Sequence, residues 1–419
     1  MLFRSAYANA GDGESTTDLV YSSHNIIAEN GNILAETKVF EMEKAIADTD
    51  VERLLSERRK MTTFSNPIER GYQTIYFDKV IKLKDKLYHR YDKNPFIPNE
   101  KEIDFNRVQA ILDIQAQGLV KRLKTVRQNR GIIGLSGGLD STLALLVTVE
   151  AFKKLHYDLK GIYAVTLPAF GTSSRTHDNA LDLANCLGVT FQEVNIKASV
   201  LQHLKDIGHD EENHNVTYEN AQARERTQVL MDMANDLNAL MIGTGDLSEL
   251  CLGWCTYNGD HMSNYGVNAS IPKTLVRYLC HGYALMHEEA KRPLLDIIDT
   301  PISPELLPTG KDGQIAQKTE DKIGPYELHD FFIFHFLRNG YGPKKLFYIT
   351  KQAHGDTYDD ATIKKWLREF YRRFFQNQFK RSCLPDGVKV GTVSISPRGD
   401  WRMPSDASSQ DFLKEIDQL

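Results

Sequence analysis

The stretch that decides the fold reads Gly131-Ile-Ile-Gly-Leu-Ser136-Gly-Gly-Leu-Asp140-Ser141-Thr-Leu-Ala-Leu-Leu-Val. It begins with a short, β-branched apolar run, as expected of a strand that is buried on both faces. Two adjacent glycines follow, which let the backbone take positive φ and let a ligand approach closely. Apolar residues then recur at helical spacing at Leu139, Leu143 and Leu146. The stretch therefore predicts a strand, a tight turn and a helix.

The predicted turn is typical of an anion site. It opens the N-terminus of a helix, where unpaired backbone N–H groups and the positive end of the helix dipole converge. Ser136 and Ser141 add hydroxyl donors. Asp140 has the wrong charge to touch a phosphate unaided, which predicts Mg²⁺ between the two. The Walker pattern is absent. The alternative is a glycine-rich turn without a ligand, which would not need two serines and an aspartate around its glycines.

The composition of the whole chain is ordinary for a soluble globular protein. Its 419 residues suffice for two or three domains, and 41% are hydrophobic and 26% charged. The net charge of -5 gives no reason to expect a nucleic acid as a partner. We find neither an apolar run of membrane-spanning length nor the apolar segment of a signal peptide. We therefore expect a cytoplasmic protein without a membrane partner.

The five cysteines form an odd and scattered set. Such a set suits a reducing compartment better than a disulfide framework. Cys251 and Cys255 lack the spacing of a zinc site and have no matching second pair. We therefore expect buried free thiols rather than a structural metal.

Strand and helix patterns alternate after the first turn. Strand patterns occur at 159–167, 190–196 and 239–243, and helix patterns at 174–187 and 220–237. Alternation implies crossover connections and a parallel sheet covered on both faces. Ligands of such sheets bind at the carboxyl ends of the strands, and Ser136, Pro168 and Thr244 all directly follow predicted strands. We therefore predict an α/β fold with a doubly wound parallel sheet.

A second candidate site lies at 243–249, where small residues and carboxylates again follow a strand. Thr244 offers a hydroxyl and backbone amides to a nucleotide, and Glu249 offers a second hard oxygen ligand. Asp140 and Glu249 are thus candidates to hold Mg²⁺ against triphosphate oxygens. In the alternative, Asp246 and Glu249 form a capping pair on a following helix. Taken alone, this segment favours neither interpretation.

Further segments complete a recognisable pattern. They are Asn220-Ala-Gln-Ala-Arg224-Glu-Arg226, Asn268-Ala-Ser-Ile-Pro272-Lys273-Thr274, Gln378-Phe-Lys380 and Ser396-Pro-Arg-Gly-Asp400-Trp-Arg. The Ser136 loop alone resembles the pyrophosphate loop of the ATP pyrophosphatases. With the segment at 243–249 and these others, it resembles the synthetase domain of the glutamine-dependent NAD⁺ synthetases, over roughly residues 95–406. The resemblance implies an adenine nucleotide alpha hydrolase-like, Rossmann-like sheet with a helical C-terminal extension.

The resemblance also implies an activity. The nicotinate carboxylate of deamido-NAD⁺ attacks the α-phosphate of ATP, pyrophosphate leaves, and ammonia then displaces AMP from the adenylate to give NAD⁺. Asp140, Lys273 and Glu249 are implied in catalysis, and Asp140 and Glu249 in holding Mg²⁺. The residues implied for ATP are Gly134, Leu135, Ser136, Gly137, Gly138, Leu139, Asp140, Ser141 and Thr244. Those implied for deamido-NAD⁺ are Asn220, Arg226, Glu249, Trp254, Cys255, Thr256, Tyr257 and Lys380. A homo-oligomer is expected on the same ground.

The N-terminal region predicts a hairpin, because Asn30-Gly31 lies between two apolar runs. It resembles the closing strands of the nitrilase-like glutaminase domain of the same family. We therefore expect a glutaminase remnant at 1–60, a linker at 61–100 and the synthetase domain at 101–419. The glutaminase cysteine of that family lies upstream of this region, whereas the first cysteine here is Cys186. We expect the glutaminase half to be truncated and the chain to depend on ammonia.

Three other segments carry predictions. An amphipathic helix at 105–127 places Val108, Ile111, Leu112, Gln115, Leu119, Leu123 and Val126 on one side. The Pro- and Gly-rich segment at 300–325 predicts a lid over ATP, with Lys311, Lys318 or Lys322 as phosphate contacts. Near 363–375, Trp366, Phe370 and Phe374 predict a core-facing stripe rather than an RNA-binding surface.

Two other functions remain open. One is a different ATP pyrophosphatase ligase, of the GMP synthetase, asparagine synthetase or tRNA-thiolating kind. The thiolating kind would need cysteines placed for sulfur transfer, which the sequence does not show. The other is an inactive nucleotide-binding fragment, against which the presence of Asp140, Glu249 and Lys273 argues.

Overall fold

The computed structural model describes residues 4–11, 13–14, 17–63, 75, 86–98, 102–171, 174–300, 306 and 319–419. The chain divides into two compact units. The first comprises Met1–Lys93 and His335–Asp360, and the second comprises Asn94–Phe334 and Ala361–Leu419. The domain boundaries expected at residues 60 and 100 stay a prediction.

The second unit is built on a five-stranded sheet in the order β6-β5-β4-β7-β8, with every neighbouring pair parallel. The strands are β4 (Gly131–Gly134), β5 (Ile162–Thr166), β6 (Thr190–Glu193), β7 (Leu240–Gly243) and β8 (Tyr265–Gly266). The chain passes from β4 to β5 and β6 on one side, and then to β7 and β8 on the other. The predicted doubly wound α/β sheet is therefore confirmed. The sequence did not predict β8, because two residues are too few to show the apolar pattern that marks a strand.

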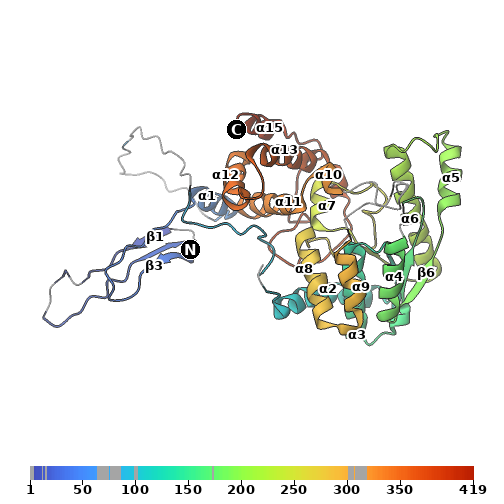
Figure 1. Ribbon diagram of the computed structural model, residues 1–419, viewed down its shortest axis with the longest axis horizontal. Coiled ribbons are helices and arrows are strands. Elements are labelled where there is room, and N and C mark those ends of the chain that lie inside the picture. The colour runs from blue at the N-terminus through green and yellow to red at the C-terminus, as the bar shows by residue number, and fades with distance from the viewer. Residues whose placement is uncertain are drawn as a thin grey trace. The chain divides into compact units, whose positions relative to one another are not determined.

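Helices cover both faces of this sheet because successive side chains of a strand point to opposite sides. Ile133 and Ile132 are both fully buried, in different clusters. The cluster of Ile133 includes residues of α2 (Phe105–Val126), α3 (Leu139–Leu155), α4 (Ser174–Cys186), α8 (Lys273–Met286) and α9 (Glu288–Ile298). That of Ile132 includes residues of α5 (Lys197–Asp206) and α6 (Val216–Asp236). Both groups of helices can be followed by their labels in Figure 1.

The helix predicted at 105–127 is α2. Its expected inward residues from Val108 to Leu123 are buried, but Val126 is exposed. The inward position predicted for Val126 is wrong because the helix ends there, with Arg127 in the left-handed conformation. The remaining elements of this unit are η1 (Leu159–Gly161), α7 (Leu247–Leu252), α10 (Thr319–Ile323), α11 (Tyr326–Ile333), α13 (Asp360–Gln376), α14 (Gln378–Ser382) and α15 (Gln410–Asp417).

The predicted stripe of α13 faces the core. Phe370 and Phe374 are fully buried, and Trp366 is half-buried. Among the described residues, no helix combines the length and the apolar character needed to cross a bilayer. All five cysteines are free, but Cys186 and Cys383 are exposed, so the expectation of buried thiols is wrong for these two.

The first unit contains an antiparallel sheet in the order β1-β2-β3, formed by β1 (Arg4–Tyr7), β2 (Ile26–Glu29) and β3 (Asn32–Glu36). Asn30 and Gly31 both have positive φ, 50° and 83°, as a two-residue hairpin requires, and the predicted hairpin is confirmed. The same unit holds α1 (Val51–Lys60) and α12 (Pro343–His354). A short π-helix, η2 (Phe334–Arg338), precedes α12.

Candidate functional site

A cavity of about 610 Å³ lies at the carboxyl ends of β4 and β7, within the second unit. Here the strand order reverses, which is where doubly wound sheets bind their ligands. Its volume is in the range of small-molecule sites. The cavity brings together Lys273 and every residue that the sequence suggested for ATP, for deamido-NAD⁺ and for the metal. Asp260 and His261, which the sequence did not suggest, line it too.

The first wall of the cavity is the turn between β4 and α3. Gly137 has φ of +81°, and a Cβ there would lie 2.2 Å from the backbone oxygen of Thr176. The turn therefore requires glycine both for its conformation and for its closeness to the next segment. Ser141 Oγ accepts from the backbone N–H of Ser136 at 3.3 Å and donates to the oxygen of Gly138 at 3.1 Å. These bonds fix the loop against the first turn of α3.

The N-terminus of α3 faces the cavity with unpaired donors. Its N-cap is Gly138, which has no side chain to accept from the helix. Within the described residues, the backbone N–H groups of Leu139 and Asp140 donate to no acceptor. Together with the helix dipole, such groups form a binding site for an anion.

The second wall is the turn between β7 and α7, where two of the backbone donors at the helix start are already occupied. The backbone N–H of Glu249 donates to Asp246 Oδ1 at 2.8 Å, and that of Leu247 to the oxygen of Ile271 at 2.9 Å. Asp246 is thus the N-cap that one interpretation of the sequence required. The carboxylate of Glu249 does not return to the cap, however. It points to Lys273 instead.

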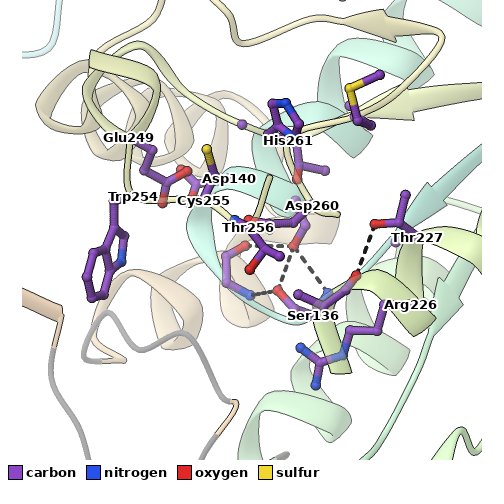
Figure 2. Close-up of a pocket in the computed structure, with 18 of the residues that line it drawn as sticks. Ser136, Asp140, Arg226, Thr227, Glu249, Trp254, Cys255, Thr256, Asp260 and His261 are labelled. Atoms are coloured by element: carbon purple, nitrogen blue, oxygen red, sulfur yellow. Dashed lines mark hydrogen bonds between the residues drawn. The ribbon is translucent and has the colours of Figure 1, made fainter. Parts of the chain in front are cut away.

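Lys273 lies among three carboxylates. Its Nζ is 2.5 Å from Asp140 Oδ2, 2.9 Å from Asp246 Oδ2 and 2.8 Å from Glu249 Oε1. Ligand atoms of the three acids lie within 4.8 Å of one another. Figure 2 shows Asp140 and Glu249 on the side of the pocket opposite Arg226. The two acids that the sequence suggested for Mg²⁺ therefore meet, joined by Asp246 as a third. The lysine suggested for a phosphate lies between them.

The electrostatics of this group favour a further cation. Three carboxylates and one ammonium leave a net charge of −2 when all are ionised. Burial, and then the neighbouring Asp140, raise the pKa of Glu249 to about 7. Burial alone would lower the pKa of Lys273, but the three carboxylates raise it well above its ordinary value, so it stays protonated.

The donor set also suits Mg²⁺ chemically. All three acids offer hard oxygen ligands, which Mg²⁺ prefers. Asp140 Oδ1 is buried and accepts no hydrogen bond within the described residues. An oxygen in that state has a lone pair available for a metal. Asp140, Asp246 and Glu249 therefore fit the ion.

Asn268 holds the two turns together. It is fully buried. Its side-chain amide donates to the backbone oxygen of Asp140 at 2.9 Å and to the backbone oxygen of Thr244 at 3.1 Å. Gln115 of α2 in turn donates to Asn268 Oδ1 at 3.1 Å. The turn between β4 and α3 (the anion-binding turn) and the turn between β7 and α7 (the acidic turn) are thus joined through the side-chain amide of Asn268.

Aromatic and amide side chains line the rest of the cavity. The Arg373 guanidinium lies over the Trp254 ring, 5.3 Å from its centroid. The rings of Tyr257 and Phe379 are 5.3 Å apart, and both side chains are 44% exposed. Flat faces of this kind suit the rings of a nucleotide. Thr256 Oγ1 donates to Asn220 Oδ1 at 2.9 Å.

The segment after α7 is held from the C-terminal helices. Lys380 Nζ donates to the oxygens of Gly253 and Cys255 at 2.8 and 2.7 Å, so two of its three protons serve the fold. Arg381 is buried and donates to the oxygen of Cys251 at 2.9 Å, at the C-terminal end of α7. Sequence reasoning missed Arg381, because its partners lie about 130 residues away. Its only local signal was its position beside Lys380.

The lid prediction reaches the described residues at one point. Lys322 lies in α10, and its Nζ is 3.7 Å from Glu219 Oε1. Lys311 and Lys318, the other predicted phosphate contacts, lie outside the described residues. The lid stays a prediction.

Comparison with known proteins places this cavity in a family. Residues 111–332, more than half of the chain, match the family model described as NAD synthase. The chain belongs to the NAD synthase family. The matched residues include both turns, Asn268 and Lys273, so the family match and the cavity coincide.

Two relatives in the NAD synthase family show how much of the chain is matched. The glutamine-dependent NAD(+) synthetase of Mycobacterium leprae is 39% identical over 447 residues, which cover 98% of this chain and 66% of that protein. The enzyme of the same name from Thermotoga maritima is 28% identical, with 95% and 64% covered. The chain thus spans about two thirds of the length of these curated relatives.

A solved structure supports the same fold. The crystal structure of a glutamine-dependent NAD(+) synthetase from Cytophaga hutchinsonii aligns with a TM-score of 0.61 at 16% sequence identity. The alignment covers 95% of this chain and 63% of that one.

Proposed function

We propose that this chain catalyses the ATP-dependent amidation of deamido-NAD⁺ to NAD⁺, with release of AMP and pyrophosphate. The observation that carries the proposal is a single cavity in which the unpaired N-terminus of α3 faces a cluster of three carboxylates. One wall suits a polyphosphate and the other suits its metal. Membership of the NAD synthase family supports the same reaction.

In the first step, an oxygen of the nicotinate carboxylate forms a bond to the α-phosphorus of ATP. The bond from that phosphorus to the bridging oxygen breaks, and pyrophosphate leaves with the electron pair. The proposed ATP contacts are the residues from Gly134 to Ser141 and Thr244. The N–H groups of Leu139 and Asp140 would hold phosphate oxygens and so stabilise the charge that develops during displacement.

Asp140 and Glu249, with Asp246 behind them, would hold Mg²⁺. When bound, the ion supplies charge neutralisation to the triphosphate and its leaving group. Lys273 keeps its proton through the reaction because the carboxylates raise its pKa. Its ammonium therefore acts as a fixed positive charge beside the phosphates rather than as an acid. Positioning and charge stabilisation carry the catalysis, and no side chain becomes a nucleophile.

The opposite part of the cavity would hold deamido-NAD⁺. The proposed contacts are Asn220, Arg226, Glu249, Trp254, Cys255, Thr256, Tyr257 and Lys380. Trp254 and Tyr257 offer ring faces, and Arg226 offers a positive charge to a carboxylate or a phosphate. Burial raises the pKa of the Cys255 thiol, so at neutral pH this residue is an uncharged lining group and not a nucleophile.

In the second step ammonia attacks the activated carboxyl carbon, AMP leaves with the carbon–oxygen electron pair, and the nitrogen loses a proton. The relatives are named glutamine-dependent. For the synthetase cavity itself we propose ammonia as the nitrogen nucleophile. A cytoplasmic homo-oligomer remains part of the proposal, as does use of Mg²⁺.

A reconstituted reaction tests this function. The chain is incubated with Mg²⁺, ATP, deamido-NAD⁺ and ammonium, and the nucleotides are separated. We expect NAD⁺, AMP and pyrophosphate in equal amounts, with each product requiring all of the reactants. Glutamine should not replace ammonium. Formation of ADP, or of AMP without deamido-NAD⁺, would point to another ligase or to an inactive fragment.

A further inference from the structure

A buried carboxylate outside the cavity accepts hydrogen bonds from residues next to the acid–lysine cluster of Asp140, Asp246, Glu249 and Lys273. Asp330 of α11 is 1% exposed and does not line the cavity. Its Oδ2 accepts from the backbone N–H of Thr274 at 2.9 Å and from Thr274 Oγ1 at 2.7 Å. Its Oδ1 accepts from the hydroxyl of Ser248. All three donors belong to the elements that carry the acid–lysine cluster.

The first turn of α8 depends on these contacts. Helix starts leave backbone N–H groups without intrahelical partners, and a capping side chain usually accepts from them. The N-cap of α8 is Pro272, which has no side-chain acceptor. The N–H of Lys273 donates instead to Ser248 Oγ at 2.9 Å, and that of Thr274 to Asp330. Residues from α7 and α11 thus supply the cap that α8 lacks.

The placement of Asp330 is costly for a purely structural group. Burial raises its pKa to about 6, so it is charged at neutral pH. Among the described residues, no Lys, Arg or His forms an ion pair with it. Hydrogen bonds from Ser248 and Thr274 and, at longer range, the charge of Lys273 favour its ionised form. A neutral residue would satisfy the packing without this desolvation.

We propose that Asp330 is a positioning residue, which fixes the first turn of α8 through Ser248 and Thr274 so that the ammonium of Lys273 lies among the three carboxylates. The side chain of Lys273 begins at the residue whose backbone this anchor holds. A shift of that backbone moves the ammonium relative to Asp140 and Glu249. The consequence for catalysis rests on the function proposed above, whereas the anchoring of Lys273 does not.

The experiment compares Asp330→Asn and Thr274→Val with wild type. Asp330→Asn keeps the shape and removes the charge, and Thr274→Val removes one hydroxyl donor. The control is Thr148→Val, which removes a fully buried threonine hydroxyl that donates within α3, at 2.7 Å to the backbone oxygen of Ala144. The readout without catalysis is acetylation of Lys273 by acetic anhydride, followed by mass spectrometry with exposed Lys124 as the internal reference.

We expect Lys273 to react about tenfold faster in Asp330→Asn, and by a smaller factor in Thr274→Val, since its protonated and enclosed state depends on its position. NAD⁺ formation should fall about 10²-fold in kcat for Asp330→Asn, because misplacement of a catalytic group by about 1 Å costs that much. The KM for deamido-NAD⁺ should change little, since Asp330 does not touch the cavity. Thr148→Val should leave both properties as in wild type.

Unchanged acetylation of Lys273 in Asp330→Asn would overturn the proposal. An equal rise in Thr148→Val would overturn it too, because the effect would then be general loosening of the fold. If wild type makes no NAD⁺ at all, the proposed function fails, while the acetylation rates still decide whether Asp330 anchors Lys273.

Discussion

The turn between β4 and α3 and the turn between β7 and α7 are alike in place and opposite in state. Both follow neighbouring parallel strands and open a helix toward the same cavity. The first leaves the N–H groups of Leu139 and Asp140 without partners. In the second, Asp246 caps the helix and Lys273 meets the acids.

The difference indicates a division of labour. An unpaired helix N-terminus attracts an anion because nothing in the protein satisfies it. Three carboxylates around a single ammonium attract a second cation instead. Asn268 ties the two turns together, so an anion and its metal would meet at a fixed separation. Removing one feature of either turn should therefore affect that turn's ligand first.

The largest effect should follow from Lys273→Met, which removes the ammonium that lies among Asp140, Asp246 and Glu249. The buried Asp246 and the partly buried Asp140 and Glu249 would then face one another without a cation, and breaking a buried ion pair costs about 3–5 kcal/mol of stability. Loss of a charge that stabilises the transition state should lower kcat by about 10³-fold. Urea unfolding and the ammonia-dependent assay measure the two effects. Lys124→Met, at an exposed position of α2, is the control, and equal behaviour of the two variants would contradict the proposed role of Lys273.

Gly137→Ala should damage the anion-binding turn almost as strongly. Its left-handed φ and the 2.2 Å approach to Thr176 should together cost about 3 kcal/mol and distort the ATP contacts. Gly188→Ala is the matched control, because Gly188 has φ of +71° and open space around it. It should cost only about 1 kcal/mol. Unfolding and ATP titration measure both, and similar losses would contradict the close approach.

The pH dependence of stability should report on Asp330, which accepts hydrogen bonds from Ser248 and Thr274. The pKa of Asp330 is raised from 3.8 to about 6 in the folded chain, so the folded state binds more protons than the unfolded state between these values. Stability therefore falls as pH rises through this window. Relative to Asp330→Asn, wild type should lose roughly 2 kcal/mol between about pH 4 and 6. Parallel stability curves for the two proteins would show that Asp330 is not buried as described.

The smallest effect should come from Ser141→Ala. Its hydroxyl joins Ser136 to Gly138, and loss of such bonds costs about 1 kcal/mol. ATP binding should weaken by roughly fivefold, and acetylation of Lys273 should not change, because Lys273 lies in α8 and forms no contact with the Ser141 hydroxyl. If Lys273 becomes more reactive, the two turns are not separate in function.

The sequence predicted the first turn well and the second only in part. Glycines, serines and a following helical period are local signals, so Gly137 and Ser141 could be interpreted without a structure. The segment at 243–249 left two interpretations open: Asp246 caps α7, as one of them required, whereas the carboxylate of Glu249 contacts Lys273 instead of the cap. Asp330 gave no signal, because it lies 56 residues from Thr274 and only folding brings them together.

The same limit applies to the fold. The buried apolar runs of β4 and its neighbours were enough to predict a doubly wound sheet. In contrast, β8 has only two residues, which pair with β7 and, through Gly266, with Gly387. Val126 was placed inward by its spacing, although the helix ends at that residue. The local spacing of apolar residues predicts helices and strands, whereas the ends of these elements and their distant partners depend on tertiary contacts.

The most direct test follows oxygen from one substrate to a product. Deamido-NAD⁺ labelled with ¹⁸O in its nicotinate carboxylate is incubated with the chain, Mg²⁺, ATP and ammonium, and the AMP formed is examined by mass spectrometry. If the carboxylate attacks the α-phosphorus in this cavity, each AMP carries one ¹⁸O. AMP without the label, or ADP in its place, would contradict the account.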